Sequence, residues 1–210
     1  SYTFTNLRAG KHYQMRVAAK SNVGVGAFTV PVAPDYREPR IPAAPTSVVA
    51  GSGDSKASVT WSVPASDGGA DITDYVIQYS TDGGGGWTQV KREASTETSA
   101  TVTGLVNGTN YVFRVAAVNA AGVGEFSALS GVVVPRTVPA VPSAVVGVGR
   151  DSEALVTWSA PASDGGSPIL DYVIQWSNNG GGIWRQVEHV ASAATTATVT
   201  GLVNGTSYVF

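Results

Sequence analysis

Residues 101–117 read TVTGLVNGTNYVFRVAA, and this stretch decides the fold. Every second residue from Tyr111 to Ala117 is apolar, which is the period of a β-strand with one buried face. The strand follows a Leu-x-x-Gly-x-x-Tyr motif, and the Asn107-Gly108 pair inside that motif is a common turn dipeptide. The stretch therefore predicts a strand that enters from a tight turn.

The same stretch belongs to a repeat. Residues 45–113 recur at residues 142–210, always 97 positions apart, with no insertion or deletion and with about two-thirds of the aligned positions identical. Residues 3–26 match residues 101–124 at an offset of 98. A fixed period of this kind means that one folding unit is used more than once. The three copies of the turn motif are Leu7/Gly10/Tyr13, Leu105/Gly108/Tyr111 and Leu202/Gly205/Tyr208.

The period predicts three units along the chain. We expect residues 1–34 to be the C-terminal part of one unit, with strands E to G. Residues 43–137 form a complete unit, and residues 140–210 form the N-terminal part of a third unit that stops within strand F. We therefore expect the chain to be a segment of a longer array. A unit of this length can bury a core without disulfide bonds.

Composition excludes several classes of protein. The 210 residues are 43% apolar and 13% charged with a net charge of −2, which is typical of a globular chain and gives no basic surface for nucleic acid. Cysteine is absent, so disulfides and thiolate zinc sites are excluded. No apolar run is long enough to predict a membrane span. We expect no cofactor.

Alternation with a period of two continues through each unit. Ala57, Val59 and Trp61 share one face of a predicted strand, and the pattern returns 97 residues later at Trp158. Turn sequences such as Asp82-Gly83-Gly84-Gly85-Gly86 separate the strands. About seven short strands in each unit predict an all-β fold, in which two antiparallel sheets pack as an immunoglobulin-like sandwich.

On these residues the unit resembles a fibronectin type III domain. The resemblance rests on the turn motif, on Trp61 followed by Pro64, and on the strand segment 72–79, ITDYVIQY. It covers nearly the whole chain apart from the linkers. It implies that each motif tyrosine is buried while its hydroxyl bonds to backbone upstream. The Gly-rich and Ser/Thr-rich composition is similar to that of bacterial secreted and surface versions, which implies an extracellular location.

Aromatic and leucine side chains that recur with the period are predicted to form the core. We expect Trp61 and Trp158 to anchor their respective sandwiches. The predicted core residues are Trp61, Tyr75, Leu105, Tyr111, Trp158, Tyr172, Leu202 and Tyr208.

Trp87 and Trp184 are the candidate surface-binding residues. Strand alternation places Trp87 and Val90 on opposite faces, so an inward Val90 would turn Trp87 outward. An exposed tryptophan beside a glycine run could stack on a sugar or contact a partner protein. The alternative is that each ring folds over the edge of its own sheet against Tyr or Gln side chains.

The sequence offers little to an enzyme. His12 and His189 align with Asn110 and Arg92, so neither recurs with the period, and we interpret both as surface residues. No Gly-x-Ser-x-Gly nucleophile motif occurs. We therefore predict a non-catalytic protein.

One group of carboxylates resembles a cation site. Asp67, Asp71 and Asp74 precede or begin a predicted strand, and hard cations prefer oxygen ligands from such loops. The next unit has Pro168 in the middle position, which removes one ligand. We therefore interpret the three as loop and turn carboxylates, and we predict no metal.

Proline-rich junctions separate the units, at residues 32–45 and 134–142. Proline fixes its own backbone angle and restricts the residue before it, so these junctions are predicted to be short semi-rigid spacers. The alternative is a plain connection without a mechanical role.

These features favour a tandem module of a larger extracellular protein that spaces and displays surfaces. Its partners would be neighbouring modules of the same kind, and surface proteins or polysaccharide. A carbohydrate-binding region attached to a secreted polysaccharide hydrolase is the first alternative, and a eukaryotic adhesion or muscle-type array is the second. Integrin binding is not expected, because Gly149-Arg150-Asp151 has the wrong order for the adhesion tripeptide.

Overall fold

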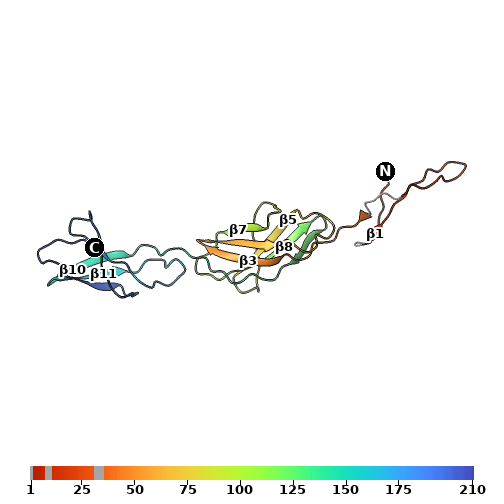
Figure 1. The fold of residues 1–210 in the computed structure, drawn as a ribbon. Helices are drawn as coiled ribbons and strands as arrows, with labels where there is room; N and C mark the ends of the chain where they lie inside the picture. The colour runs from red at the N-terminus through yellow and green to blue at the C-terminus, as the bar shows by residue number, and fades with distance from the viewer. Residues whose placement is uncertain (1, 8–10, 31–35) are drawn as a thin grey trace. The chain divides into compact units, whose positions relative to one another are not determined.

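The computed structural model describes residues 2–7, 11–30 and 36–210 (Figure 1). Its regular elements are all β-strands, which confirms the predicted all-β fold. Among the residues that it describes, no helix is long and apolar enough to cross a membrane. The chain forms two compact units.

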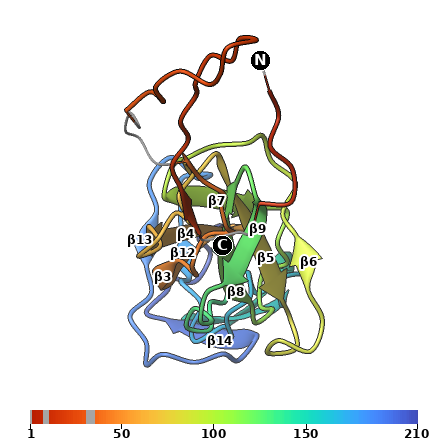
Figure 2. The same cartoon turned by 90° about the vertical axis from the view of Figure 1, so that its right-hand side faces the viewer.

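The middle of the chain folds into two antiparallel sheets, as the strand pattern predicts. One sheet has the order β3-β4-β7 and the other the order β6-β5-β8-β9 (Figure 2). These strands are β3 (Thr46–Gly53), β4 (Lys56–Ser62), β5 (Asp74–Ser80), β6 (Thr88–Gln89), β7 (Ser99–Thr103), β8 (Val112–Asn119) and β9 (Gly122–Phe126).

Strict alternation in β4 directs one face of that strand into the sandwich. Ala57, Val59 and Trp61 are buried, while the residues between them are exposed. From the opposite sheet, Ile77 of β5 pairs with Val115 of β8 and both are fully buried. Full burial of one such aliphatic side chain stabilises a fold by about 1.5–3 kcal/mol. Stacking of the two apolar faces therefore creates the core.

Strand β8 departs from simple alternation. Val112 and Ala116, on the face opposite to Val115, are also buried. Ala116 pairs with Val76 on one side and with Phe126 on the other, so two larger side chains shield its small one from solvent. A strand inside a four-stranded sheet can therefore be buried on both faces, which its alternation alone does not predict.

The C-terminal part of the chain repeats this architecture with fewer paired strands. One sheet has the order β10-β11-β14 and a second pairs β12 with β13. The strands are β10 (Ser143–Arg150), β11 (Glu153–Ser159), β12 (Gln175–Trp176), β13 (Arg185–Gln186) and β14 (Thr196–Thr200). The buried cluster consists of Ala154, Val156, Ile174, Val199 and Leu202.

Core packing in this second sandwich copies the first at the aromatic anchor. The ring centroids of Trp158 and Tyr172 lie 5.1 Å apart with an interplanar angle of 64°, against 5.2 Å and 61° for Trp61 and Tyr75. Strand β10, by contrast, is exposed along its full length. The repeat therefore preserves the edge-to-face contact, while burial at the rim differs between the two copies.

The N-terminal residues contain one short strand pair and a hairpin. β1 (His12–Tyr13) pairs antiparallel with β2 (Tyr36–Arg37). Lys20 and Val25 form a β-bridge that corresponds to the Val118–Val123 pair of the middle sandwich. Most side chains of this hairpin are exposed. Gly10 of the first turn motif, residues 31–34 of the first predicted unit and the His12 side chain lie outside the described parts.

Candidate interaction surface

Trp87 lies at the start of the β6 edge of the four-stranded sheet. Its ring is half-buried rather than free, because the guanidinium of Arg114 lies over it, 3.9 Å from the ring centroid. The ring therefore folds back onto its own sheet. Of the two arrangements considered from the sequence, this is closer to the second, but the side chain that contacts the ring is an arginine rather than a tyrosine or glutamine.

Arg114 projects from the outer face of β8 between two aromatic rings. Its other contact is the ring of Phe126 on β9, at 4.2 Å from the centroid. Its Nε and Nη2 atoms both donate to Oε1 of Gln78 on β5, at 2.9 and 2.7 Å. Three strands and the residue that precedes β6 thus contribute to one polar-aromatic cluster, which we call the Trp87 stack: Gln78, Trp87, Arg114 and Phe126.

Cation–π contacts of this kind stabilise a fold by about 0.5–1 kcal/mol each when exposed and by about 2 kcal/mol or more when desolvated. The half-buried position of the Trp87 stack places it between these limits. The N-terminal hairpin contains the matching pair, since Arg16 lies 4.4 Å from the ring centroid of Phe28. The arginine–phenylalanine contact is therefore part of the repeat, and its signal in the sequence is the recurrence of both residues with the unit.

A glycine-rich turn places Trp87 against the sheet. The carboxylate of Asp82 accepts hydrogen bonds from the Ser80 hydroxyl and from the backbone N–H groups of the glycines at 84, 85 and 86. These bonds, that from Ser80 first, lower the pKa of Asp82 to about 2. Gly84 has a φ of 114°, and a side chain there would lie 3.4 Å from the Trp87 ring. The positive φ therefore favours glycine at this position, where an added Cβ would only be in ordinary contact with the ring.

Trp184 occupies the equivalent position in the second sandwich and is more exposed, at 46%. Asn179 replaces Asp82 there, and its Oδ1 accepts from the backbone N–H of Ile183 at 2.9 Å. A side chain at Gly181 would lie 3.5 Å from the Trp184 ring. The turn is therefore built in a similar way with a neutral cap, and it presents a more accessible ring.

The eight residues predicted for the core lie inside the two sandwiches or at their rims. Trp158 and Tyr208 are half-buried and pack against the buried cluster of the second sandwich. The buried members are Trp61, Tyr75, Leu105, Tyr111, Tyr172 and Leu202.

Tyr208 shows the backbone bond predicted for a motif tyrosine. The Tyr208 hydroxyl accepts a hydrogen bond from the backbone N–H of Val203 at 3.0 Å, five residues upstream. This confirms, for Tyr208, the hydrogen bond that the resemblance implies.

The asparagine of the second and third turn motifs makes a connection that sequence reasoning missed. Asn107 Oδ1 accepts from the Ser55 backbone N–H at 2.9 Å, and its Nδ2 donates to Asp54 Oδ1 at 2.9 Å. Asn204 repeats both bonds with residues 152 and 151. The available signal was the recurrence of the Asp-Ser dipeptide at the opposite hairpin.

The carboxylates that resembled a cation site have separate partners. Asp67 caps a turn through the backbone N–H of Gly69 at 2.8 Å, and Asp74 forms a salt bridge with Arg92 at 2.9 Å. Asp71 is exposed. Within the described residues no three such side chains gather around one point. The contacts of Asp67 and Asp74 are therefore of the kind that turn-capping and ion-paired carboxylates make.

His189 takes the position of Arg92 in the second sandwich. Its Nε2 lies 2.9 Å from the carbonyl oxygen of Tyr172, where Arg92 Nη2 lies 2.9 Å from that of Tyr75. Sequence reasoning interpreted this histidine as a plain surface residue because it does not recur. The alignment of His189 with Arg92 in the repeat was the sequence signal for this shared contact.

Comparisons with known proteins agree with the two successive β-sandwiches of the structure. A model of the fibronectin type III domain matches residues 43–132 and 139–210. Myomesin-2 of Homo sapiens is 33% identical over 156 residues, which are 71% of this chain and 11% of that protein. Striated-muscle M-protein of Gallus gallus is 31% identical over 218 residues, which are 100% of this chain and 15% of that protein.

A solved structure of titin domains is also similar. It is 30% identical and covers 56% of this chain and 38% of that chain, with a TM-score of 0.46. The chain thus spans a small share of the curated relatives that it matches, 11% and 15% of their lengths.

Proposed function

Because this chain belongs to the fibronectin type III family, with successive matches over residues 43–132 and 139–210, we propose that it is a non-catalytic segment of a larger protein, which spaces and displays interaction surfaces. The observation that carries this proposal is the serial repetition of one domain with a filled apolar core. The match to striated-muscle M-protein of Gallus gallus over 100% of this chain supports the non-catalytic assignment. The domain limits that we propose are residues 43–137 and 140–210, with residues 1–34 as part of a preceding domain.

The spacer role can be tested by small-angle scattering of the 210-residue chain. We expect a maximum dimension well above that of a globular protein of the same mass, because proline-rich junctions restrict folding back. A variant with Pro139→Gly and Pro142→Gly, both exposed positions, serves as the matched control and should give a broader distance distribution. A compact scattering profile for the unmodified chain would contradict the spacer role.

Location outside the cell is part of the proposal. It is supported by the Gly-rich and Ser/Thr-rich composition, which resembles that of bacterial surface proteins. The competing location is a muscle-type array inside the cell, which the names of the relatives favour. Cell fractionation and protease accessibility on intact cells of the source organism would distinguish the two, since only a surface protein is cleaved without lysis.

A polysaccharide-binding role is the second candidate, and the exposure of Trp184 is the observation that favours it. A ring that is 46% exposed beside a glycine turn can stack against a pyranose face. The test is retention of the chain on insoluble cellulose, chitin and peptidoglycan, with Trp184→Ala as the variant and Trp87→Ala as the half-buried comparison. Loss of retention in Trp184→Ala alone would support this role, and equal elution of all three chains would exclude it for these polymers.

A further inference from the structure

Two equivalent loops are each held by a basic side chain, Arg92 in the first sandwich and His189 in the second. The loop of residues 90–98 joins β6 to β7 in the first sandwich, and the loop of residues 187–195 joins β13 to β14 in the second. In both loops a serine backbone N–H donates to an aspartate at 3.0 Å. Ser95 donates to Asp74, the first residue of β5, and Ser192 donates to Asp171, which precedes β12. Both basic side chains therefore lie in the same frame, by which we mean the serine–aspartate hydrogen bond and the adjacent tyrosine carbonyl.

Arg92 fills this frame in the first sandwich with permanent donors. Nη2 donates to the carbonyl oxygen of Tyr75 at 2.9 Å and to Asp74 Oδ1 at 2.9 Å, while Nη1 donates to the carbonyl oxygen of Glu93 at 3.1 Å. A guanidinium stays protonated over the whole physiological range, so these bonds do not depend on pH.

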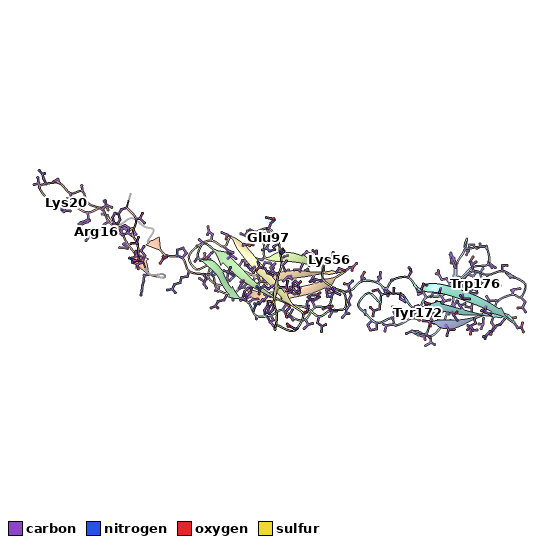
Figure 3. All side chains as sticks on the ribbon, turned by 180° about the vertical axis from the view of Figure 1, so that it is seen from behind. Arg16, Lys20, Lys56, Glu97, Tyr172 and Trp176 are labelled. Carbon is purple, nitrogen blue, oxygen red and sulfur yellow. The ribbon has the colours of Figure 1, made fainter. Side chains whose placement is uncertain are left out.

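His189 reproduces two of these contacts with a ring that can lose a proton. Nε2 lies 2.9 Å from the carbonyl oxygen of Tyr172, and Nδ1 lies 3.0 Å from that of Val190 (Figure 3 labels Tyr172). Carbonyl oxygens accept hydrogen bonds and donate none. A neutral imidazole has one N–H, so it can serve one of the two oxygens and turns a lone pair toward the other. The imidazolium, with two N–H groups, serves both.

The charged groups around the ring favour the protonated form. Asp171 Oδ1 lies 3.8 Å from Nδ1, and Glu188 precedes the histidine in the same loop. The Val190 carbonyl has the largest effect, followed among the favourable groups by Asp171, the Tyr172 carbonyl and Glu188, and together they raise the pKa of His189 above its ordinary value against the opposing effect of burial.

We propose that His189 is a pH-dependent clamp, which fastens the 187–195 loop to the segment before β12 at Tyr172 when the imidazole is protonated and releases it when the imidazole is neutral. The first sandwich keeps the equivalent loop fastened at all physiological pH values through Arg92. The chain thus carries one responsive and one constant domain built on the same frame.

The sign of the pH dependence follows from the raised pKa of His189. A group that binds its proton more tightly in the folded state stabilises the fold fully below its unfolded pKa, and that contribution is lost as the pH rises through the higher folded pKa. The clamp is therefore closed in mildly acidic solution and opens through the neutral range.

The test follows both loops in the 210-residue chain by NMR between about pH 5 and about pH 8. We expect His189 to titrate above the ordinary histidine pKa, and the hydrogen-exchange protection factor of the Ser192 amide to fall several-fold as it does so. The protection factor of the Ser95 amide should stay constant. His12→Gln leaves a single histidine and assigns the signals.

Reciprocal substitutions provide the matched controls. His189→Arg should make Ser192 protection independent of pH, and Arg92→His should transfer the pH dependence to Ser95. Titration of His189 at or below the ordinary histidine pKa, or equal protection of Ser192 across the titration in the unmodified chain, would overturn the proposal. If Arg92→His disrupts the first sandwich, the outcome for His189→Arg still decides.

Discussion

At the scale of single residues, the fold depends on a few large side chains whose neighbours are fixed. Trp61 is 5% exposed and meets Tyr75 edge to face. Arg114 lies between Trp87 and Phe126 on the outer face of the four-stranded sheet. The first contact forms inside the core and the second at its surface, so substitutions at the two places should have effects of different size.

Trp61→Ala should destabilise the first sandwich by about 3–5 kcal/mol, because removal of a buried indole leaves a cavity in a close-packed core. Trp61→Phe is the matched variant and should cost less, since it retains a ring against Tyr75. Urea denaturation of residues 43–137, expressed alone, measures both values. A loss below about 1 kcal/mol for the alanine variant would contradict the anchoring role.

Arg114→Ala should cost about 1–2 kcal/mol, because two ring contacts and the bonds to Gln78 disappear together. Arg114→Lys is the control, since it keeps the charge but loses the planar fork that meets both rings and the amide. The fluorescence of the chain should shift to longer wavelength in the alanine variant as the Trp87 ring becomes more exposed. Equal stability of the arginine and lysine forms would show that charge alone matters at this position.

At the scale of elements, the turns are fastened by side chains that accept hydrogen bonds from the backbone. Asp82 gathers three glycine N–H groups in the first sandwich, and Asn179 takes its position in the second. Asn107 joins its turn to the hairpin at Ser55. Such bonds determine the geometry of these turns, which the alternation of apolar residues in the strands does not predict.

The Asp82 turn should lose order in acid. The pKa of Asp82 in the folded chain is about 2, below its unfolded value, so the contribution of the carboxylate is present above the unfolded pKa and is lost as the pH falls through about 2. We expect the amide signals of Gly85 and Gly86 to titrate with this low pKa. Asp82→Asn, which copies the cap of the second sandwich, should remove the titration and keep the turn. A midpoint at the ordinary aspartate pKa would show that these bonds are not formed in solution.

At the scale of the whole molecule, the two sandwiches have separate buried clusters. The second cluster is built from residues 154–202, and the aromatic anchors Trp61 and Trp158 each meet a tyrosine of their own sandwich. Substitutions in separate cores have largely independent effects on stability.

Trp61→Ala in the full chain should therefore lower the unfolding midpoint of the first sandwich and leave the second unchanged. Amide exchange of Val59 and Val156, one buried residue from each core, reports the two separately. Trp158→Ala provides the reciprocal control. Equal loss of protection in both cores after either substitution would show that the two unfold as one cooperative unit.

The sequence by itself determined the all-β fold, the repeat, and the strands that alternate strictly, such as β4 with its buried face at Val59. The strand alternation and the turns are local features, because the two-residue period and the turn dipeptides depend on near neighbours along the chain. The repeat is visible by direct comparison of residues 97 positions apart. Fixed spacing also predicted the Tyr208 hydroxyl bond through the family resemblance.

Only the tertiary structure decided how Trp87 lies, why Ala116 is buried and what His189 contacts. Each depends on a residue far away in the chain: Arg114 over Trp87, Val76 and Phe126 beside Ala116, and the Tyr172 carbonyl at His189. The pairing of strands brings these groups together. The sequence of one strand does not show which residues will lie beside it in the sheet. Burial and hydrogen bonding at these sites are therefore properties of the assembled sandwich, whereas strand periodicity is a property of the chain.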